Sequence, residues 1–330
     1  MDSMVGFTCY DTYTWPLAVI KTSVTLKNYI FKFSTIVFLI ILGSCKNERS
    51  NTKEIDSSSF ENSYFGLKPP GNTPVTFAPG IISTNNWEAG GVFSPDLKEF
   101  YFIREVGETE DEKTMNFMVY HYKDNEWRDS IISTRVGQPF ISPDGKTMHL
   151  GRRYKDRLEN GNWSELKNLD STLYNVPIMR LTSSEKGTYV FDAMGEGLLR
   201  YSRLVNGERE TPKLFGEEFN SGTANAHPFI APDESYILWD SRREIGHGGA
   251  DRYVSFRQED GSWGKAINLG KEINSTASEG GARVTPDGKY LFFNRNVGKI
   301  KPTDKYEDVN MFWVDAKVIE KLKTQKSSSE

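Results

Sequence analysis

The stretch from Ala224 to Asn296 decides the fold, because one phrase occurs twice within it. Residues 228–240 read PFIAPDESYILWD, and residues 282–295 read ARVTPDGKYLFFNR. In both copies a short apolar run leads into a Pro-Asp pair, and an aromatic-rich run follows it. Proline presets φ for the first turn position and aspartate bonds its own backbone, so the pair predicts a turn between two strands. A phrase that returns after about fifty residues indicates a repeat.

Two more copies lie upstream, at Pro95 and Pro143. The four prolines at 95, 143, 232 and 286 are separated by 48, 89 and 54 residues. The gap of 89 residues is close to two periods, and a degenerate copy lies midway in it, where Leu181–Gly187 leads into Thr188–Asp192. The sequence therefore contains five copies of the repeat.

Each copy predicts more than a hairpin. A third strand is expected at 117–121, 198–202, 252–256 and 311–314, and a fourth at 127–134, 163–169 and 263–269. These segments are short and rich in β-branched and aromatic residues, as strands usually are. Four short strands at a period near 48 residues are typical of one blade of a β-propeller.

The motifs within the deciding stretch also resemble a known family. Besides the Pro-Asp turn, the stretch contains Gly248-Gly249-Ala250-Asp251-Arg252-Tyr253 and Asp260-Gly261-Ser262-Trp263. Together they resemble the WD40-like propeller repeats of TolB-type periplasmic proteins, over roughly residues 74–316. The resemblance implies an all-β propeller of four-stranded blades. It implies little about activity, because one fold hosts many functions.

The two ends of the repeat region suggest how the ring closes. Thr76–Ile82 resembles the fourth strand of a blade whose first three strands are missing, while the last blade, near 280–315, has only three strands. If the N-terminal strand completes the C-terminal blade, no sheet edge stays open. We therefore predict five blades, with six as the alternative if the insert at 296–310 contains a further strand pair.

The N-terminal segment predicts export and lipidation. Lys21, Lys27 and Lys32 precede an apolar run at 34–44, and Leu42-Gly43-Ser44-Cys45 follows the pattern of a secretory signal that ends in a bacterial lipobox. The apolar run is too short to span a bilayer. Residues 1–20 fit a signal poorly, so the true start is expected near residues 24–26. We expect Cys45 to carry the lipid, with palmitate among its acyl chains, and Lys46 after it favours the outer membrane over the inner one.

These features divide the chain into a signal peptide at 1–44, a lipidated Cys and flexible tether at 45–72, a propeller at 73–316 and a C-terminal tail at 317–330. Removing residues 1–44 takes away three Lys and two Asp, so the net charge changes from −4 to −5. This charge argues against nucleic acid as a partner. No Cys follows Cys45 and the His spacing forms no metal motif, so no cofactor and no metal are expected.

The register of the repeat gathers polar residues at one mouth of the predicted channel. The turn joins the first and second strands, so the start of the first strand and the end of the second lie on the opposite face. Candidate ligand-binding residues at that mouth are Arg104, Arg152, Arg242, Arg295, Gln138 and Asn225. Guanidinium groups bind carboxylates bidentately, which suggests an anionic or sugar ligand. The alternative for the arginines is structural pairing with a carboxylate of a neighbouring blade.

The same register gives catalytic candidates. Glu88, Glu279 and Asp240 could act as acid, base or nucleophile in glycoside cleavage, and His227 could act as a base. We detect no nucleophile elbow or phosphate-binding loop. The favoured prediction is a lipid-anchored binding or scaffold module of the cell envelope, with an envelope protein or an anionic or sugar ligand. The alternative is a glycan-active hydrolase or lyase that uses these residues.

Overall fold

The computed structural model describes residues 63–109, 111–300 and 306–327. All of them belong to one compact unit, Ile55–Glu330. The predicted signal, Cys45 and most of the predicted tether lie outside the described residues. In the part of the chain that the structure describes, no helix is long and apolar enough to cross a bilayer.

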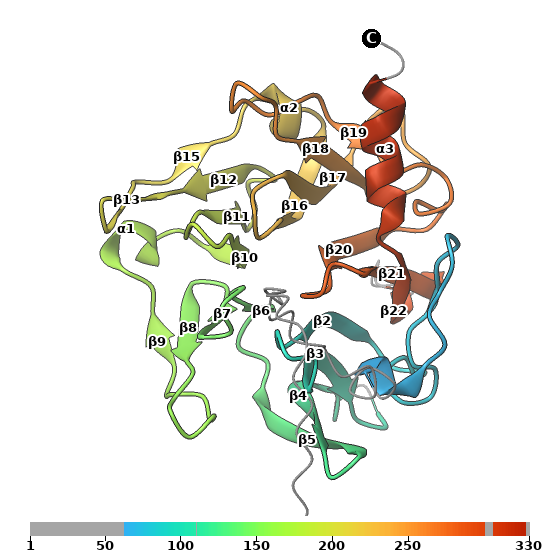
Figure 1. Ribbon diagram of the computed structural model, residues 1–330. Coiled ribbons are helices and arrows are strands. Elements are labelled where there is room, and N and C mark those ends of the chain that lie inside the picture. The colour runs from blue at the N-terminus through green and yellow to red at the C-terminus, as the bar shows by residue number, and fades with distance from the viewer. Residues whose placement is uncertain (1–62, 110, 301–305, 328–330) are drawn as a thin grey trace, which may run out of the picture. The chain divides into compact units, whose positions relative to one another are not determined.

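Five four-stranded antiparallel sheets stand around a common centre, as blades of a propeller (Figure 1). Blade 1 contains β2 (Glu88–Phe93), β3 (Glu99–Val106), β4 (Thr114–Lys123) and β5 (Glu126–Thr134). Blade 2 contains β6 (Pro139–Ile141), β7 (Thr147–Leu150), β8 (Arg153–Asp156) and β9 (Lys167–Asn168). The short helix α1 (Ser171–Tyr174) leads from blade 2 to blade 3.

Blade 3, the degenerate copy, contains β10 (Ile178–Ser183), β11 (Tyr189–Ala193), β12 (Leu199–Ser202) and β15 (Lys213–Leu214), and carries the small hairpin of β13 (Leu204–Val205) and β14 (Glu208–Arg209). Helix α2 (Glu217–Asn220) follows it. Blade 4 contains β16 (Thr223–Ile230), β17 (Tyr236–Arg242), β18 (Asp251–Phe256) and β19 (Ile267–Asn268). The prediction of an all-β propeller with five blades is confirmed.

Blade 5 combines the two ends of the repeat region. It contains β20 (Glu279–Val284), β21 (Tyr290–Ile300) and β22 (Tyr306–Asp315), and its outer strand is β1 (Val75–Thr76), in which Val75 pairs with Trp313. The strand is shorter than the expected Thr76–Ile82, because the chain turns back at Ala78 to accept hydrogen bonds from the backbone of Ile81 and Ile82. The described parts of the insert, 296–300 and 306–310, extend β21 and β22 as paired strands and add no blade.

The apolar core is divided among the junctions between blades. Each of five buried clusters joins neighbouring blades, and the one between blades 4 and 5 also includes Phe140 of blade 2. The cluster between blades 5 and 1, for example, contains Phe77, Phe93, Phe292 and Trp313. Helix α3 (Lys317–Ser327) begins where the propeller ends, and its Ile319 is buried in the cluster between blades 4 and 5. Since all five junctions are apolar, the ring is held by burial at every junction.

The repeated turns are built as the sequence predicts. Ser94 and Ser142 donate from Oγ to the aspartates two residues later, Asp96 and Asp144, at 2.6 Å in each case. Thr285 donates to Asp287 at 2.7 Å in the same way. These aspartates are therefore turn residues. The turns that follow β2, β6 and β20 lie at the same end of the channel.

Candidate functional site

The predicted mouth lies at the end of the channel away from the Pro-Asp turns. There the first residues of the innermost strands face the last residues of the second strands. Glu88 pairs with Arg104 in blade 1, Ala226 with Asp240 in blade 4, and Glu279 with Arg295 in blade 5. The register therefore brings Glu88, Glu279, Asp240 and His227 to one end of the propeller, as the sequence suggests.

Glu88 is fully buried and is held by the chain around it. Arg104 Nε lies 3.2 Å from its Oε1, and the backbone N–H and hydroxyl of Thr84 also donate to it. Arg104 Nη2 donates to the carbonyl oxygens of Ile81 at 2.6 Å and Ile82 at 3.0 Å. Burial raises the pKa of the Glu88 carboxyl above its ordinary value, although the bonds from Thr84 and Arg104 oppose this.

Glu279 repeats this arrangement in blade 5. Its Oε1 lies 2.9 Å from Arg295 Nε and accepts from the backbone N–H and hydroxyl of Ser275. Its Oε2 lies 2.7 Å from Nη2 of Arg252, which is fully buried in blade 4. Arg295 Nη2 then donates to Ile273 O at 3.1 Å. Two blades thus use the same Glu–Arg pair to fix the segment that precedes the innermost strand.

The remaining predicted ligand-binding residues are less constrained. Arg242 is exposed and its Nε donates to Gly249 O at 3.4 Å. Arg152 is exposed, and Gln138 is half-buried at the start of blade 2. Asn225 is buried; its Nδ2 donates to Gly197 O at 3.0 Å, and its Oδ1 lacks a hydrogen-bond partner among the described residues.

His227 and Asp240 form a close pair. His227 Nδ1 lies 2.7 Å from Asp240 Oδ2, which also accepts from the backbone N–H of Gly281 at 2.9 Å. The side chain of His227 is 25% exposed and that of Asp240 is 3% exposed, so only the imidazole of this pair reaches solvent. Within the described residues, His227 Nε2 makes no hydrogen bond, and it is the atom free to meet a ligand.

The backbone explains why the imidazole stands at this place. His227 has φ 51°, in the left-handed region, and the equivalent bulge positions of blades 1 and 5 are Gly90 with φ 73° and Gly281 with φ 69°. The backbone N–H of His227 donates to Asp192 Oδ2 at 2.7 Å. A non-glycine residue in this region is strained by roughly 1–2 kcal/mol, and such strain is typical of functional positions.

Two buried residues of blade 3 complete the cluster and were not predicted. Asp192 accepts from the backbone N–H of Arg180 at 2.8 Å, and Arg180 Nη2 donates across the channel to Ala282 O at 3.3 Å. Burial lowers the pKa of Arg180 to about 10, although the Asp240 and Asp192 carboxylates favour its charged form. Its Nε and Nη1 have no hydrogen-bond partner among the described residues.

A signal for Asp192 was available in the sequence. When Ser184 is aligned with the repeat proline, Asp192 follows it by eight residues, as Asp240 follows Pro232 and Asn294 follows Pro286. The missing Pro-Asp pair of blade 3 hid this register. Arg180 had no such signal, because its direction across the channel depends on the assembled ring.

The cluster can orient a ligand that forms a hydrogen bond with the His227 imidazole, because two carboxylates hold this residue in place. The carboxylates hold the imidazole at Nδ1 and the backbone at its bulge, which leaves Nε2 to donate or accept. In the described ranges, no group of three His, Cys, Asp or Glu side chains is placed to hold a metal ion.

Fold and site together define a five-bladed β-propeller with a polar cluster at one mouth. No protein-family model and no curated protein match the chain. Among solved structures, TolB from Acinetobacter baumannii is similar, with 15% identity, a TM-score of 0.41, and coverage of 69% of this chain and 54% of TolB. This chain therefore spans about half of that TolB chain.

Two carbohydrate-active proteins are also similar in fold. A GH62 hydrolase solved with xylotriose has 10% identity and a TM-score of 0.43, over 77% of this chain and 99% of the hydrolase. An oligogalacturonate lyase solved with manganese has 14% identity and a TM-score of 0.37, over 70% of this chain and 65% of the lyase. At these identities the likeness concerns the arrangement of strands and not the ligand.

Proposed function

We propose that this protein is an extracytoplasmic, lipid-anchored binding module of the cell envelope, with its ligand at the channel mouth beside His227. The observation that supports a binding role is that the carboxylates at the mouth are buried and paired. Glu88 and Glu279 are fully buried and paired with arginines, and Asp240 is 3% exposed. Cleavage of a glycoside needs two carboxyl groups that flank the scissile bond, whereas here the imidazole alone reaches solvent from the described cluster.

The proposed ligand is an anionic or sugar molecule, or an acidic segment of an envelope protein. His227 Nε2 would bond it directly, and the exposed guanidinium groups of Arg152 and Arg242 would attract negative charge near the mouth. Arg104 and Arg295 would support the mouth without touching the ligand, because both are tied to a glutamate and to backbone carbonyls.

Binding is tested on purified protein with a panel of acidic and neutral oligosaccharides, with affinity measured by calorimetry. We expect His227→Gln to weaken binding about tenfold or more, because the buried Asp240 then loses its imidazole partner and the ligand loses its bond. His121→Gln is a matched control, since His121 is 48% exposed on β4 and is remote in register from the mouth. Equal affinities for wild type and His227→Gln would contradict the proposal.

The proposed location in the outer membrane rests on the sequence around Cys45. Metabolic labelling with palmitate, followed by separation of the membranes, should place label on the wild type in the outer membrane. Cys45→Ser should lose the label and leave the membrane fraction. Label that persists in Cys45→Ser would show that the lipid is attached elsewhere or that the labelling is unspecific.

A glycan-active enzyme is the second candidate, and the His227–Asp240 pair is the observation that favours it. A carboxylate at 2.7 Å from Nδ1 orients an imidazole so that Nε2 can take or give a proton. Incubation with polysaccharides should then produce reducing ends or unsaturated ends. Asp240→Asn would abolish turnover, and unchanged turnover in that variant would exclude this role for the pair.

A further inference from the structure

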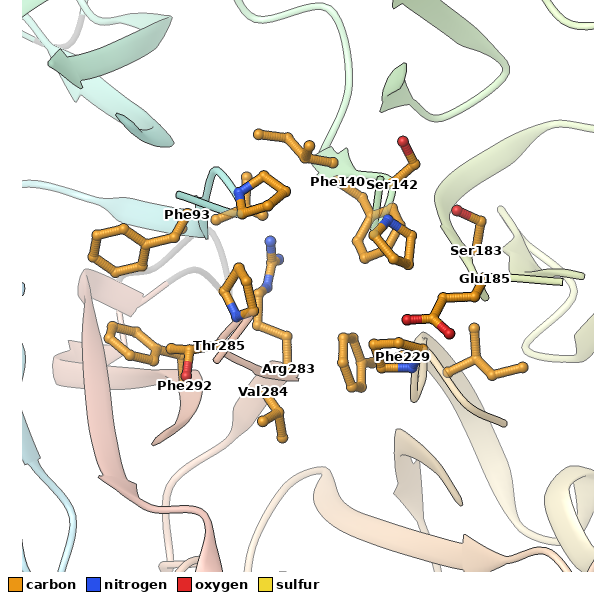
Figure 2. A pocket seen from close by; sticks show the side chains of 18 residues that line it. Phe93, Phe140, Ser142, Ser183, Glu185, Phe229, Arg283, Val284, Thr285 and Phe292 are labelled. Atoms are coloured by element: carbon orange, nitrogen blue, oxygen red, sulfur yellow. The ribbon is translucent and has the colours of Figure 1, made fainter. Parts of the chain in front are cut away.

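The opposite end of the channel, on the side of the Pro-Asp turns, contains a second cavity. Its volume is about 140 Å³, and it is lined by the last residues of the innermost strands of all five blades together with the turns that follow them (Figure 2). It shares no residue with the His227 mouth. A ligand here would enter from the face that the turns form.

The wall of this turn-side pocket is mainly apolar. Phe140 and Phe229 form part of it through an edge-to-face contact, with 6.5 Å between ring centroids, and Phe93 and Phe292 line the side of blades 1 and 5. The rim is made by the four prolines of the repeat: Pro95, Pro143, Pro232 and Pro286. An apolar cavity of roughly 150 Å³ binds benzene, so the volume of this pocket is close to that of a single six-membered ring.

One buried cation projects into these apolar surroundings. Arg283 is 4% exposed and extends from β20 across the pocket toward blades 1 and 2 (Figure 2). Its Nη1 donates to Gly90 O at 3.2 Å and to Pro139 O at 3.1 Å, while Nη2 has no hydrogen-bond partner among the described residues. Arg283 forms no salt bridge in the described part of the chain, although the Asp240 carboxylate is near enough to favour its charged form. A buried charge that is not paired directly with a carboxylate is costly.

The second guanidinium in the channel increases the need for an anion. Burial lowers the pKa of Arg283 well below its ordinary value, and the nearby charge of Arg180 lowers it further, while the Asp240 carboxylate opposes both effects. The carboxylate of Glu185, an exposed residue of the turn in blade 3, points toward the pocket from the rim (Figure 2). The pocket thus offers one buried donor to a single carboxylate, and its rim repels a second negative charge.

We propose that the turn-side pocket binds a small monocarboxylate that carries an apolar six-membered ring, with Arg283 Nη2 bonded to the carboxylate. The ring would lie against the apolar wall that Phe140 and Phe229 form. The site is separate from the proposed mouth at His227, so either proposal can fail without the other.

Benzoate is the probe, and titration calorimetry on the full-length protein is the measurement. We expect saturable binding at one site per chain, and about tenfold or weaker affinity for benzamide, which has the same ring without the charge. Arg283→Met should abolish benzoate binding. Arg128→Met is the matched control, because Arg128 lies in an exposed pair with Glu126 on β5 and should leave binding unchanged.

Glu185→Gln tests the proposal without touching the buried groups, and decides if Arg283→Met does not fold. Glu185 is exposed, so its loss should spare the fold and tighten benzoate binding severalfold by removing repulsion at the rim. Absence of saturable benzoate binding, equal affinity for benzamide, or an affinity that Glu185→Gln leaves unchanged would overturn the proposal.

Discussion

For single residues, the mouth shows that the sequence can predict where a side chain lies without predicting what it does. The repeat register placed Glu88 and Glu279 at the mouth from the sequence alone. It could not show that Arg104 and Arg295 would pair with them, because burial of both partners depends on the segments 81–84 and 273–275 that fold over them. We therefore propose that both glutamates are structural, although the sequence made them catalytic candidates.

Glu279→Gln tests that assignment. The change leaves Arg252 and Arg295 without their carboxylate, so we expect the free energy of unfolding to fall by roughly 3–5 kcal/mol in urea denaturation. Glu126→Gln, in an exposed pair with Arg128, should cost less than about 1 kcal/mol. A stable Glu279→Gln variant that loses turnover of a glycan would instead support a catalytic role.

His149 predicts a pH dependence that belongs to a single residue. It is fully buried between Phe140 and Tyr189, and burial, with the charge of Arg209, lowers its pKa to about 3. The unfolded chain has the ordinary value of about 6.5, so it binds a proton that the folded chain rejects between those two values. The stabilisation is thus present above pH 6.5 and is lost as the pH falls toward 3.

Comparing urea denaturation at pH 7 and about pH 5 checks this sign. From pH 7 to 5 the wild type should lose about 2 kcal/mol more than His149→Phe does. Wild type and variant share all other titrating groups, so their difference isolates the imidazole. Equal losses in the two proteins would mean that His149 has the same pKa in the folded and the unfolded chain.

At the scale of elements, the innermost strand carries a bulge in four blades, between 89 and 92, 178 and 181, 226 and 229, and 280 and 283. The bulge turns Gly90 and Gly281 into the left-handed region, and in blade 4 the same position is His227. The sequence predicted the strand but not the bulge, because the extra residue is visible only once its partner strand is aligned.

Replacing His227 by Gly and by Ala separates the backbone from the imidazole. Both variants lack the ring, so both should lose ligand binding at the mouth. His227→Gly should be more stable than His227→Ala by about 1 kcal/mol, because glycine adopts a φ of 51° without strain. The melting temperatures of the two variants measure the difference. Equal stability would indicate that the bulge relaxes when the histidine is removed.

For the molecule as a whole, the spacing of the repeated Pro-Asp turns was enough to predict five blades. Pro-Asp turns are local, and their spacing is visible without a structure. The residues that cross the channel, Arg180 and Arg283, were missed because they act between blades. The bounds of β1 were also misplaced, since the sequence of 76–82 fits a strand and only the packing of Phe77 and Ala78 shows where the chain turns.

The outer strand of blade 5, β1, is predicted to stabilise the entire ring. A chain that starts at residue 84 lacks β1 and the fully buried Phe77, and leaves the edge of β22 open. We expect its melting temperature to fall by at least about 10 °C relative to a chain that starts at residue 63, and we expect self-association through the open edge. Calorimetry and size-exclusion chromatography measure both. Equal stability of the two chains would mean that β1 does not hold the ring closed.

The arginines that cross the channel also bear on how such a protein can evolve. Arg180 reaches from blade 3 to Ala282 O at 3.3 Å, and Arg283 reaches from blade 5 to Gly90 O and Pro139 O at 3.2 and 3.1 Å. Duplication of one repeat would widen the ring, and side chains of fixed length would no longer span it. Lineages of this propeller that gain a sixth repeat should therefore have replaced both arginines.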